Sequence, residues 1–165
     1  MNFSFSKIYI VAPAGYASGG PELSHQLGRR LNDIGFSAFM FYLGADKFSG
    51  ACPIHSAYEK YAVPYVLNLD DAPGNLIIFP EVNASLASLF PLSKKILWWL
   101  SVDNFYKVKS GYAGKYNRYI IKWGLDGSYF RFTNARLLNT FDLHLAQSHY
   151  ALKFLENLPI RQLTY

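Results

Sequence analysis

Residues 8–23 carry the strongest fold signal in the chain and read Ile-Tyr-Ile-Val-Ala-Pro-Ala-Gly-Tyr-Ala-Ser-Gly-Gly-Pro-Glu-Leu. A short apolar run, typical of a buried strand, gives way to a loop with glycines at 15, 19 and 20. A helix is predicted to start at Pro21. The first N–H groups of a helix have no intrahelical partner, and the helix dipole favours negative charge beside them. Strand, glycine turn and helix N-terminus together predict a place where a phosphate can bind.

The residues that follow the turn predict a β-α-β unit. Four apolar residues recur at spacings of four, four and three on one face of the predicted helix: Leu23, Leu27, Leu31 and Ile34. Gly35 is expected to end this helix. Residues 37–43 are mostly apolar, as in a strand buried on both faces of a parallel sheet. The unit spans about 35 residues, the usual length for a right-handed crossover.

Strands and helices alternate through the rest of the chain. Further strands are predicted at residues 65–68, 75–81, 94–101 and 141–148, and residues 160–165 resemble the start of another. Asn83 and Ser148 are predicted to cap helices that follow two of these strands. The alternation predicts an α/β fold with a Rossmann-like, doubly wound, mainly parallel sheet, formed as one domain over residues 1–165.

Composition excludes several classes of protein. The chain has 165 residues, of which 51% are hydrophobic and 16% charged, so it can bury a core and is not disordered. Cys52 is the single cysteine, which rules out an internal disulfide and fits a reducing compartment. No apolar run approaches the ~20 residues of a membrane span. The net charge of +5 indicates an anionic partner.

The glycine turn departs from the two best-known phosphate-binding motifs. Pro21 and Glu22 stand where a Walker A motif needs Lys and Ser or Thr, so triphosphate hydrolysis has no support. The dinucleotide pattern G-x-G-x-x-G is absent, and Asp46 comes too late after residues 37–43 to be the usual ribose-binding acid. An ordinary tight turn between strand and helix remains an alternative.

Together, these motifs resemble the N-terminal domain of retaining, nucleotide-sugar-dependent glycosyltransferases of the GT-B fold. The matching features are the Gly-Gly-Pro-Glu sequence at 19–22 that opens a helix, the strand at 76–81, the strand and loop at 94–104, and the strand at 143–148 before a late helix. The resemblance covers nearly the whole chain, although each motif is short.

The resemblance implies a two-domain enzyme that moves a sugar from a nucleotide sugar to a surface polysaccharide or lipid-linked acceptor. A C-terminal domain beyond Tyr165 would bind the nucleotide sugar, and this domain would bind most of the acceptor. The amides of Gly19 and Gly20 would face the donor phosphate and stabilise the leaving nucleoside diphosphate. No cofactor or metal is expected, and the sequence has no paired His or Cys-x-x-Cys spacing for a metal. The domain alone is expected to be inactive.

Candidate catalytic residues lie where predicted strands end. Related retaining enzymes often carry a histidine in the loop after the strand equivalent to 96–100, but here residues 101–104 read Ser-Val-Asp-Asn. Asp103 is therefore a candidate catalytic residue and Asn104 a candidate acceptor contact, although Asp103 could instead only cap the next segment. Glu81 is a second catalytic candidate, because ligands bind at the carboxyl ends of parallel strands.

Two histidines near the last long predicted strand receive different interpretations. His149 follows the end of that strand and is a candidate acceptor-binding residue. His144 lies inside the strand and is expected to be a hydrogen-bonded core residue.

Residues 105–132 combine aromatic and basic side chains at helical spacing. The candidate acceptor-binding residues in this segment are Tyr112, Lys115, Tyr116 and Arg118. Sugars stack on aromatic faces and lipid pyrophosphates need cations, and the same pattern suits peripheral contact with an anionic membrane, at the cytoplasmic face of a bacterial plasma membrane. A core-facing aromatic stripe with a solvated basic back is the alternative. Nucleic acid is not an expected partner, because no RNA-binding signature accompanies the pattern.

Overall fold

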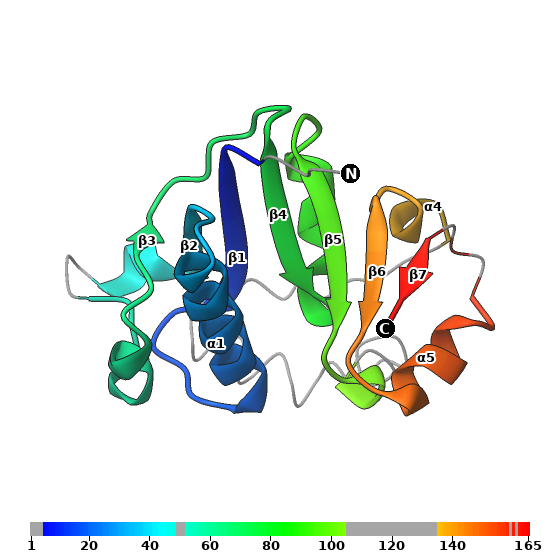
Figure 1. The fold of residues 1–165 in the computed structure, drawn as a ribbon, viewed down its shortest axis with the longest axis horizontal. Helices are drawn as coiled ribbons and strands as arrows, with labels where there is room; N and C mark the ends of the chain where they lie inside the picture. The colour runs from blue at the N-terminus through cyan, green and yellow to red at the C-terminus, as the bar shows by residue number, and fades with distance from the viewer. Residues whose placement is uncertain (1–4, 49–51, 105–134, 159, 161) are drawn as a thin grey trace.

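The computed structural model describes residues 5–48, 52–104, 135–158, 160 and 162–165 (Figure 1). Seven parallel strands form one sheet in the order β3-β2-β1-β4-β5-β6-β7. The strands are β1 (Lys7–Pro13), β2 (Ala38–Leu43), β3 (Tyr65–Val66), β4 (Asn75–Pro80), β5 (Lys94–Trp99), β6 (Leu143–Ala146) and β7 (Leu163–Thr164). This arrangement confirms the predicted α/β, Rossmann-like, doubly wound fold.

Helical segments lie on both faces of the sheet. The described residues form the α-helices α1 (Gly19–Asp33), α4 (Ala135–Leu138) and α5 (His149–Leu155) and the 3-10 helices η1 (Ala45–Phe48), η2 (Ser56–Tyr61) and η3 (Glu81–Leu89), and residues 102–104 are helical as well. In Figure 1, α1 lies in front of the sheet and η3 behind it. Among the described residues, no helix is both long and apolar enough to cross a membrane.

The two hydrophobic cores follow from the alternation of side chains along the strands. On one face, Tyr9, Ile77 and Trp99 belong to a cluster that also includes residues of η3, α4 and α5. On the other face, Ile10 and Met40 belong to a second cluster, against which α1 packs. All six residues of β4 are buried, because this central strand is covered on both faces.

Helix α1 begins at Gly19, two residues earlier than predicted, with Ser18 as its N-cap. Proline is tolerated anywhere in the first turn, since N–H groups there have no intrahelical partner, so Pro21 does not mark the first helical residue. The predicted end at Gly35 is confirmed. Gly35 has a φ of 93°, and its N–H donates to the carbonyl of Asn32 at 3.1 Å while that of Phe36 donates to Leu31 at 3.0 Å, which is a Schellman motif.

The buried face of α1 matches the predicted leucine stripe only in part. Its buried residues are Ser24, His25 and Gly28, whereas Ile34 is 58% exposed. A Cβ on Gly28 would lie only 2.9 Å from Cγ1 of Val63, so the absence of a side chain lets the helix approach its neighbours closely. Small and polar residues therefore lie deepest on this face, while Leu27 and Leu31 of the predicted stripe are half-buried and pack against the second core.

Of the two predicted helix caps, the one after β4 is wrong and the one after β6 is confirmed. Asn83 does not cap a helix, because η3 starts directly at Glu81 and buries Asn83 within it. Ser148 does cap α5, since its Oγ accepts a hydrogen bond from the N–H of Ala151 at 3.1 Å.

Candidate functional site

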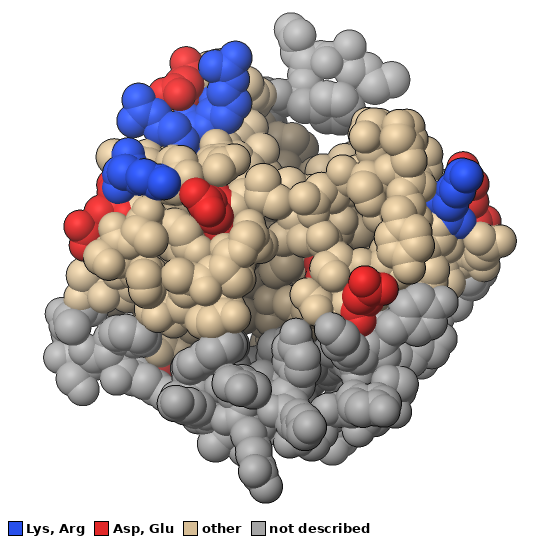
Figure 2. Space-filling model, turned by 90° about the horizontal axis from the view of Figure 1, so that it is seen from below, with Lys and Arg blue, Asp and Glu red and all other residues tan. Residues whose placement is uncertain are grey.

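The carboxyl edge of the sheet, between β1 and β4, is the place where a ligand is expected in this topology. Strand β1 lies between β2 and β4, so the strand order reverses at β1, and open α/β sheets bind ligands at such a point. Figure 2 looks onto this edge and shows it hollowed near its middle, with the Lys and Arg side chains of the described residues toward its margins. Within the described part of the chain, an anion bound there would therefore be met by backbone dipoles rather than by these cations.

Gly19 and Gly20 open α1 at this edge. Ser18 makes no side-chain cap hydrogen bond, so the first N–H groups of the helix receive no acceptor from the helix or from its cap side chain. A Cβ on Gly19 would meet nothing within 4 Å, and the φ of Gly19 is not positive, so neither packing nor backbone geometry requires glycine there. At Gly20 a Cβ would lie 3.5 Å from Cδ1 of Leu100, which places this turn beside the end of β5.

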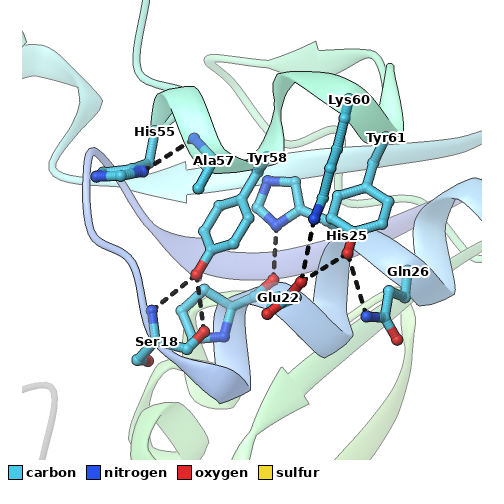
Figure 3. Close-up of polar contacts among 10 residues, drawn as sticks. Ser18, Glu22, His25, Gln26, His55, Ala57, Tyr58, Lys60 and Tyr61 are labelled. Atoms are coloured by element: carbon cyan, nitrogen blue, oxygen red, sulfur yellow. Dashed lines mark hydrogen bonds and ion pairs between the residues drawn. The ribbon is translucent and has the colours of Figure 1, made fainter.

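Tyr58 of η2 holds the N-cap of α1 in place (Figure 3). Ser18 is fully extended, with φ −163° and ψ 174°, so its N–H and C=O point to the same side, as in a strand. The Tyr58 hydroxyl accepts from that N–H at 2.7 Å and donates to that carbonyl at 2.7 Å. Burial raises the pKa of Tyr58, which keeps the donating proton in place.

A buried histidine connects this tyrosine to the sheet. His25 is 2% exposed and its ring stacks on that of Tyr58 with centroids 4.5 Å apart. Burial lowers the pKa of His25, so the ring is neutral. Its Nδ1–H donates to the carbonyl of Pro21 at 2.6 Å, and Nε2 therefore accepts from the hydroxyl of Tyr42 at 2.7 Å.

Glu22, the acidic residue in the first turn of α1, is held on the η2 side. Its carboxylate accepts a hydrogen bond from the Tyr61 hydroxyl at 2.7 Å and lies 3.5 Å from Nζ of Lys60. The Tyr61 hydrogen bond is the main reason why the pKa of Glu22 is lowered. Figure 3 shows the three side chains directed toward one another, so this negative charge is partnered beside the glycine turn.

Glu81 stands where β4 passes into η3 and is almost wholly buried, at 3% exposure. Its Oε2 accepts a hydrogen bond from the N–H of Leu100 at 2.9 Å. Burial raises the pKa of Glu81 to about 7, although hydrogen bonds from backbone amides, that of Leu100 first, act in the opposite direction.

The turn after β5 carries the other predicted residues of this edge. Asp103 is exposed, and Asn104 is half-buried. Residues 102–104 form a helical turn, and the Oγ of Ser101 accepts from the N–H of Asn104 at 3.3 Å, so Ser101 rather than Asp103 caps this helical turn. An exposed carboxylate at a strand end can accept a hydrogen bond from a substrate hydroxyl.

Of the two histidines near β6, one lies in the core and the other at the surface. His144 is buried, accepts from Nε1 of Trp99 at 3.0 Å and donates to the carbonyl of Leu138 at 3.0 Å, which confirms it as a hydrogen-bonded core residue. His149 is exposed at the start of α5, and its ring stacks on Tyr165 at 4.5 Å.

The structure thus brings Gly20, Glu81 and the turn at 101–104 together through Leu100, with His149 at the end of the next strand, β6. Predicted residues that lie outside the described part of the chain are Tyr112, Lys115, Tyr116 and Arg118. Sequence reasoning missed Tyr58 and Tyr61, whose only signal is the density of tyrosines at 58–65.

The described residues contain no group of three or more His, Cys, Asp or Glu side chains that could hold a metal ion. Comparison of the chain with protein-family models gives no match, and neither does comparison with curated protein sequences.

Proposed function

We propose that this domain is the acceptor-side half of a glycosyltransferase that moves a sugar from a nucleotide sugar to a surface polysaccharide or lipid-linked acceptor. The observation that carries the proposal is the uncapped first turn of α1, with its open space at Gly19, at the point where the strand order reverses. A leaving nucleoside diphosphate gains negative charge, and preorganised backbone N–H groups at a helix N-terminus stabilise such charge.

Asp103 and Asn104 are the residues that we assign to the acceptor hydroxyl, because both lie on the turn at the end of β5 and Asp103 is exposed. Glu81 is too deeply buried to touch an acceptor. We assign further acceptor contacts to His149 and, from sequence alone, to Tyr112, Lys115, Tyr116 and Arg118. The aromatic and basic segment at 105–132 would also contact an anionic membrane from the cytoplasmic side. The proposal includes no metal.

The anion site can be tested with inorganic pyrophosphate as the probe and the amide resonances of Gly19 and Gly20 as the reporters. We expect saturable shifts at both amides. Gly19→Pro removes one N–H donor. Proline fits there because Gly19 is the first residue of the helix and Ser18 before it is extended, and proline favours both. A hydrogen bond to a charged group contributes about 1.5–3 kcal/mol, so binding should weaken by about tenfold to a hundredfold.

Gly19→Ala is the matched control, because it adds a methyl group in open space and keeps the N–H. It should bind pyrophosphate within about twofold of the unsubstituted protein, since no donor is lost. If pyrophosphate shifts neither glycine amide, or if Gly19→Pro binds as well as Gly19→Ala, the anion site is wrong.

The transferase activity itself needs a donor-binding domain, so the decisive observation is the reading frame after the codon of Tyr165. We expect a second α/β domain there, and transfer of a radiolabelled sugar by the longer protein but not by residues 1–165. A stop codon directly after Tyr165 would contradict the proposal.

A self-contained nucleotide- or dinucleotide-binding module is the second candidate. The strand order at β3-β2-β1-β4-β5-β6 favours it, because this is the order of dinucleotide-binding domains. The end of β2 does not, since Leu43 and Gly44 stand where the ribose-binding acid belongs. Calorimetry with NAD and with a nucleotide sugar separates the candidates: tight binding of either by residues 1–165 supports the module.

A further inference from the structure

Glu81 supplies an acceptor that the sheet itself cannot provide. The last backbone pair between β4 and β5 joins Pro80 to Trp98, after which the chain turns from β4 into η3. The N–H of Leu100 therefore has no neighbouring strand residue to bond. Oε2 of Glu81 takes that place at 2.9 Å, and the carboxyl group ties the end of β5 to the end of β4.

Leu100 extends this connection to α1. Its Cδ1 lies 3.5 Å from the position of a Cβ on Gly20, an ordinary van der Waals distance. The same residue thus bonds to Glu81 through its backbone, and its side chain lies beside the first turn of α1. Directly after it comes the turn with Ser101 and Asp103.

Burial and backbone hydrogen bonds, rather than nearby charged side chains, determine the pKa of Glu81. No charged side chain is among the causes of its pKa shift. On the turn that it bonds, Asp103 is exposed; on α1, Glu22 is held by Tyr61; and on β5, Lys95 donates to the carbonyls of Phe90 and Ser93. An ionised carboxylate accepts more strongly than a neutral one, so the bond to Leu100 strengthens when Glu81 loses its proton.

We propose that Glu81 is a positioning residue rather than an acid–base catalyst, and that it fixes Leu100 and the turn at 101–104 relative to the first turn of α1. The inference rests on the proposed function, since the first turn of α1 is the anion site that Glu81 would position. Its role follows from the hydrogen bond between Glu81 and Leu100 and from the position of the Leu100 side chain beside Gly20.

The first test follows the amide resonances of Leu100 and Gly20 in the ligand-free protein as the pH is raised. Both should titrate together with a midpoint at the pKa of Glu81, about 7. Glu81→Gln keeps an oxygen acceptor and removes the charge, so both titrations should disappear while the fold remains. A Gly20 amide that stays constant while that of Leu100 titrates would overturn the inference, because Leu100 would then not transmit the change.

The second test removes the acceptor. In Glu81→Leu, hydrogen exchange at the Leu100 amide should rise several-fold, because its hydrogen-bond acceptor is lost. Pyrophosphate binding should weaken several-fold, and Glu81→Gln should restore it. If Glu81→Leu does not fold, the pH titration of the Leu100 and Gly20 amides in Glu81→Gln still tests the inference.

Asp142→Leu is the matched control, because Asp142 accepts from the N–H of Lys95 at 2.8 Å at the opposite end of β5. It should leave the Leu100 exchange rate and pyrophosphate binding unchanged, and equal effects of the two leucine variants would contradict a local role for Glu81. Joint titration of Leu100 and Gly20 without any pyrophosphate binding would support the positioning contact and reject the anion site, so the two failures are distinguishable.

Discussion

Strand β5 is held at each end by a carboxyl group from another segment, and the two groups differ in their surroundings. At its start, Asp142 accepts from the Lys95 amide and pairs with Lys94 at 2.9 Å. At its end, Glu81 accepts from the Leu100 amide and has no cationic partner among the described residues. Burial acts to raise the pKa of each carboxyl group. At Asp142 the hydrogen bonds from Lys94 and from the Lys95 amide, together with the charge of Lys94, have the larger effect, so the pKa of Asp142 is lowered.

Because of this difference, the ionised carboxylate of Asp142 stabilises the folded protein, whereas that of Glu81 destabilises it. Asp142 is more favourable in the folded protein when ionised, so it stabilises the fold at neutral pH. Glu81 is more favourable when protonated, so its ionisation near neutral pH opposes folding. Groups that are kept at such a cost concentrate at functional sites, which agrees with the hollow that lies at the same edge.

The largest expected effect is on the pH dependence of stability. The pKa of Glu81 is raised in the folded state from 4.5 to about 7, so its contribution is fully present below pH 4.5 and is lost as the pH rises through about 7. The loss amounts to about 3 kcal/mol, at 1.36 kcal/mol per pKa unit. Urea unfolding of Glu81→Gln should lack this decline. An equal decline in both proteins would remove the contrast with Asp142.

The next effect concerns His144, a buried histidine of β6 whose ring is hydrogen-bonded to Trp99 at the end of β5. Trp99→Phe removes the N–H that donates to Nδ1 of His144, which leaves a buried acceptor unpaired and a small cavity. The free energy of unfolding should fall by about 2 kcal/mol. Trp98→Phe, at a half-buried position on the other face, is the control and should cost clearly less. Equal losses would show that the His144 contact adds nothing.

A smaller effect is expected at the start of β5. Asp142→Ala should cost about 1 kcal/mol at pH 7 through the lost bond to the Lys95 amide. The pKa of Asp142 is lowered from 3.8, so its contribution is present above pH 3.8 and is lost as the pH falls through the folded-state value. Urea unfolding at neutral and strongly acidic pH should therefore show the deficit shrinking in acid. A deficit that grows in acid would contradict the opposite signs of the two carboxyl groups.

The smallest effect is a gain. Gly19→Ala should raise the free energy of unfolding by about 0.5 kcal/mol, because alanine loses less backbone entropy in a helix and a Cβ there meets nothing. Gly35→Ala should instead cost about 1 kcal/mol, since Gly35 has a φ of 93°. Thermal melting curves measure both. If Gly19→Ala is destabilising, the glycine serves the fold rather than a ligand.

The sheet was predictable from sequence because its strands are continuous apolar runs, as central parallel strands must be. The face of α1 was predictable only in part: Leu27 and Leu31 pack against the second core, but His25 and Gly28 are buried for their hydrogen bonds and small volume, which an apolar pattern does not register. The strand ends at Glu81 and at residues 101–104 were predictable as neighbours, since parallel strands end at one edge. The contact between Ser18 and Tyr58 was not, because nothing in either local sequence specifies the other.

That contact has a consequence for the order of folding. Helix α1 and its neighbouring strands can form from residues close in sequence, but the Tyr58 hydroxyl reaches Ser18 from 40 residues away. Closing a longer loop costs more chain entropy, and contacts between distant residues tend to form late. We therefore expect the glycine turn to become ordered only after η2 has docked, so that the end of α1 nearest the hollow is the last part of the β-α-β unit to mature.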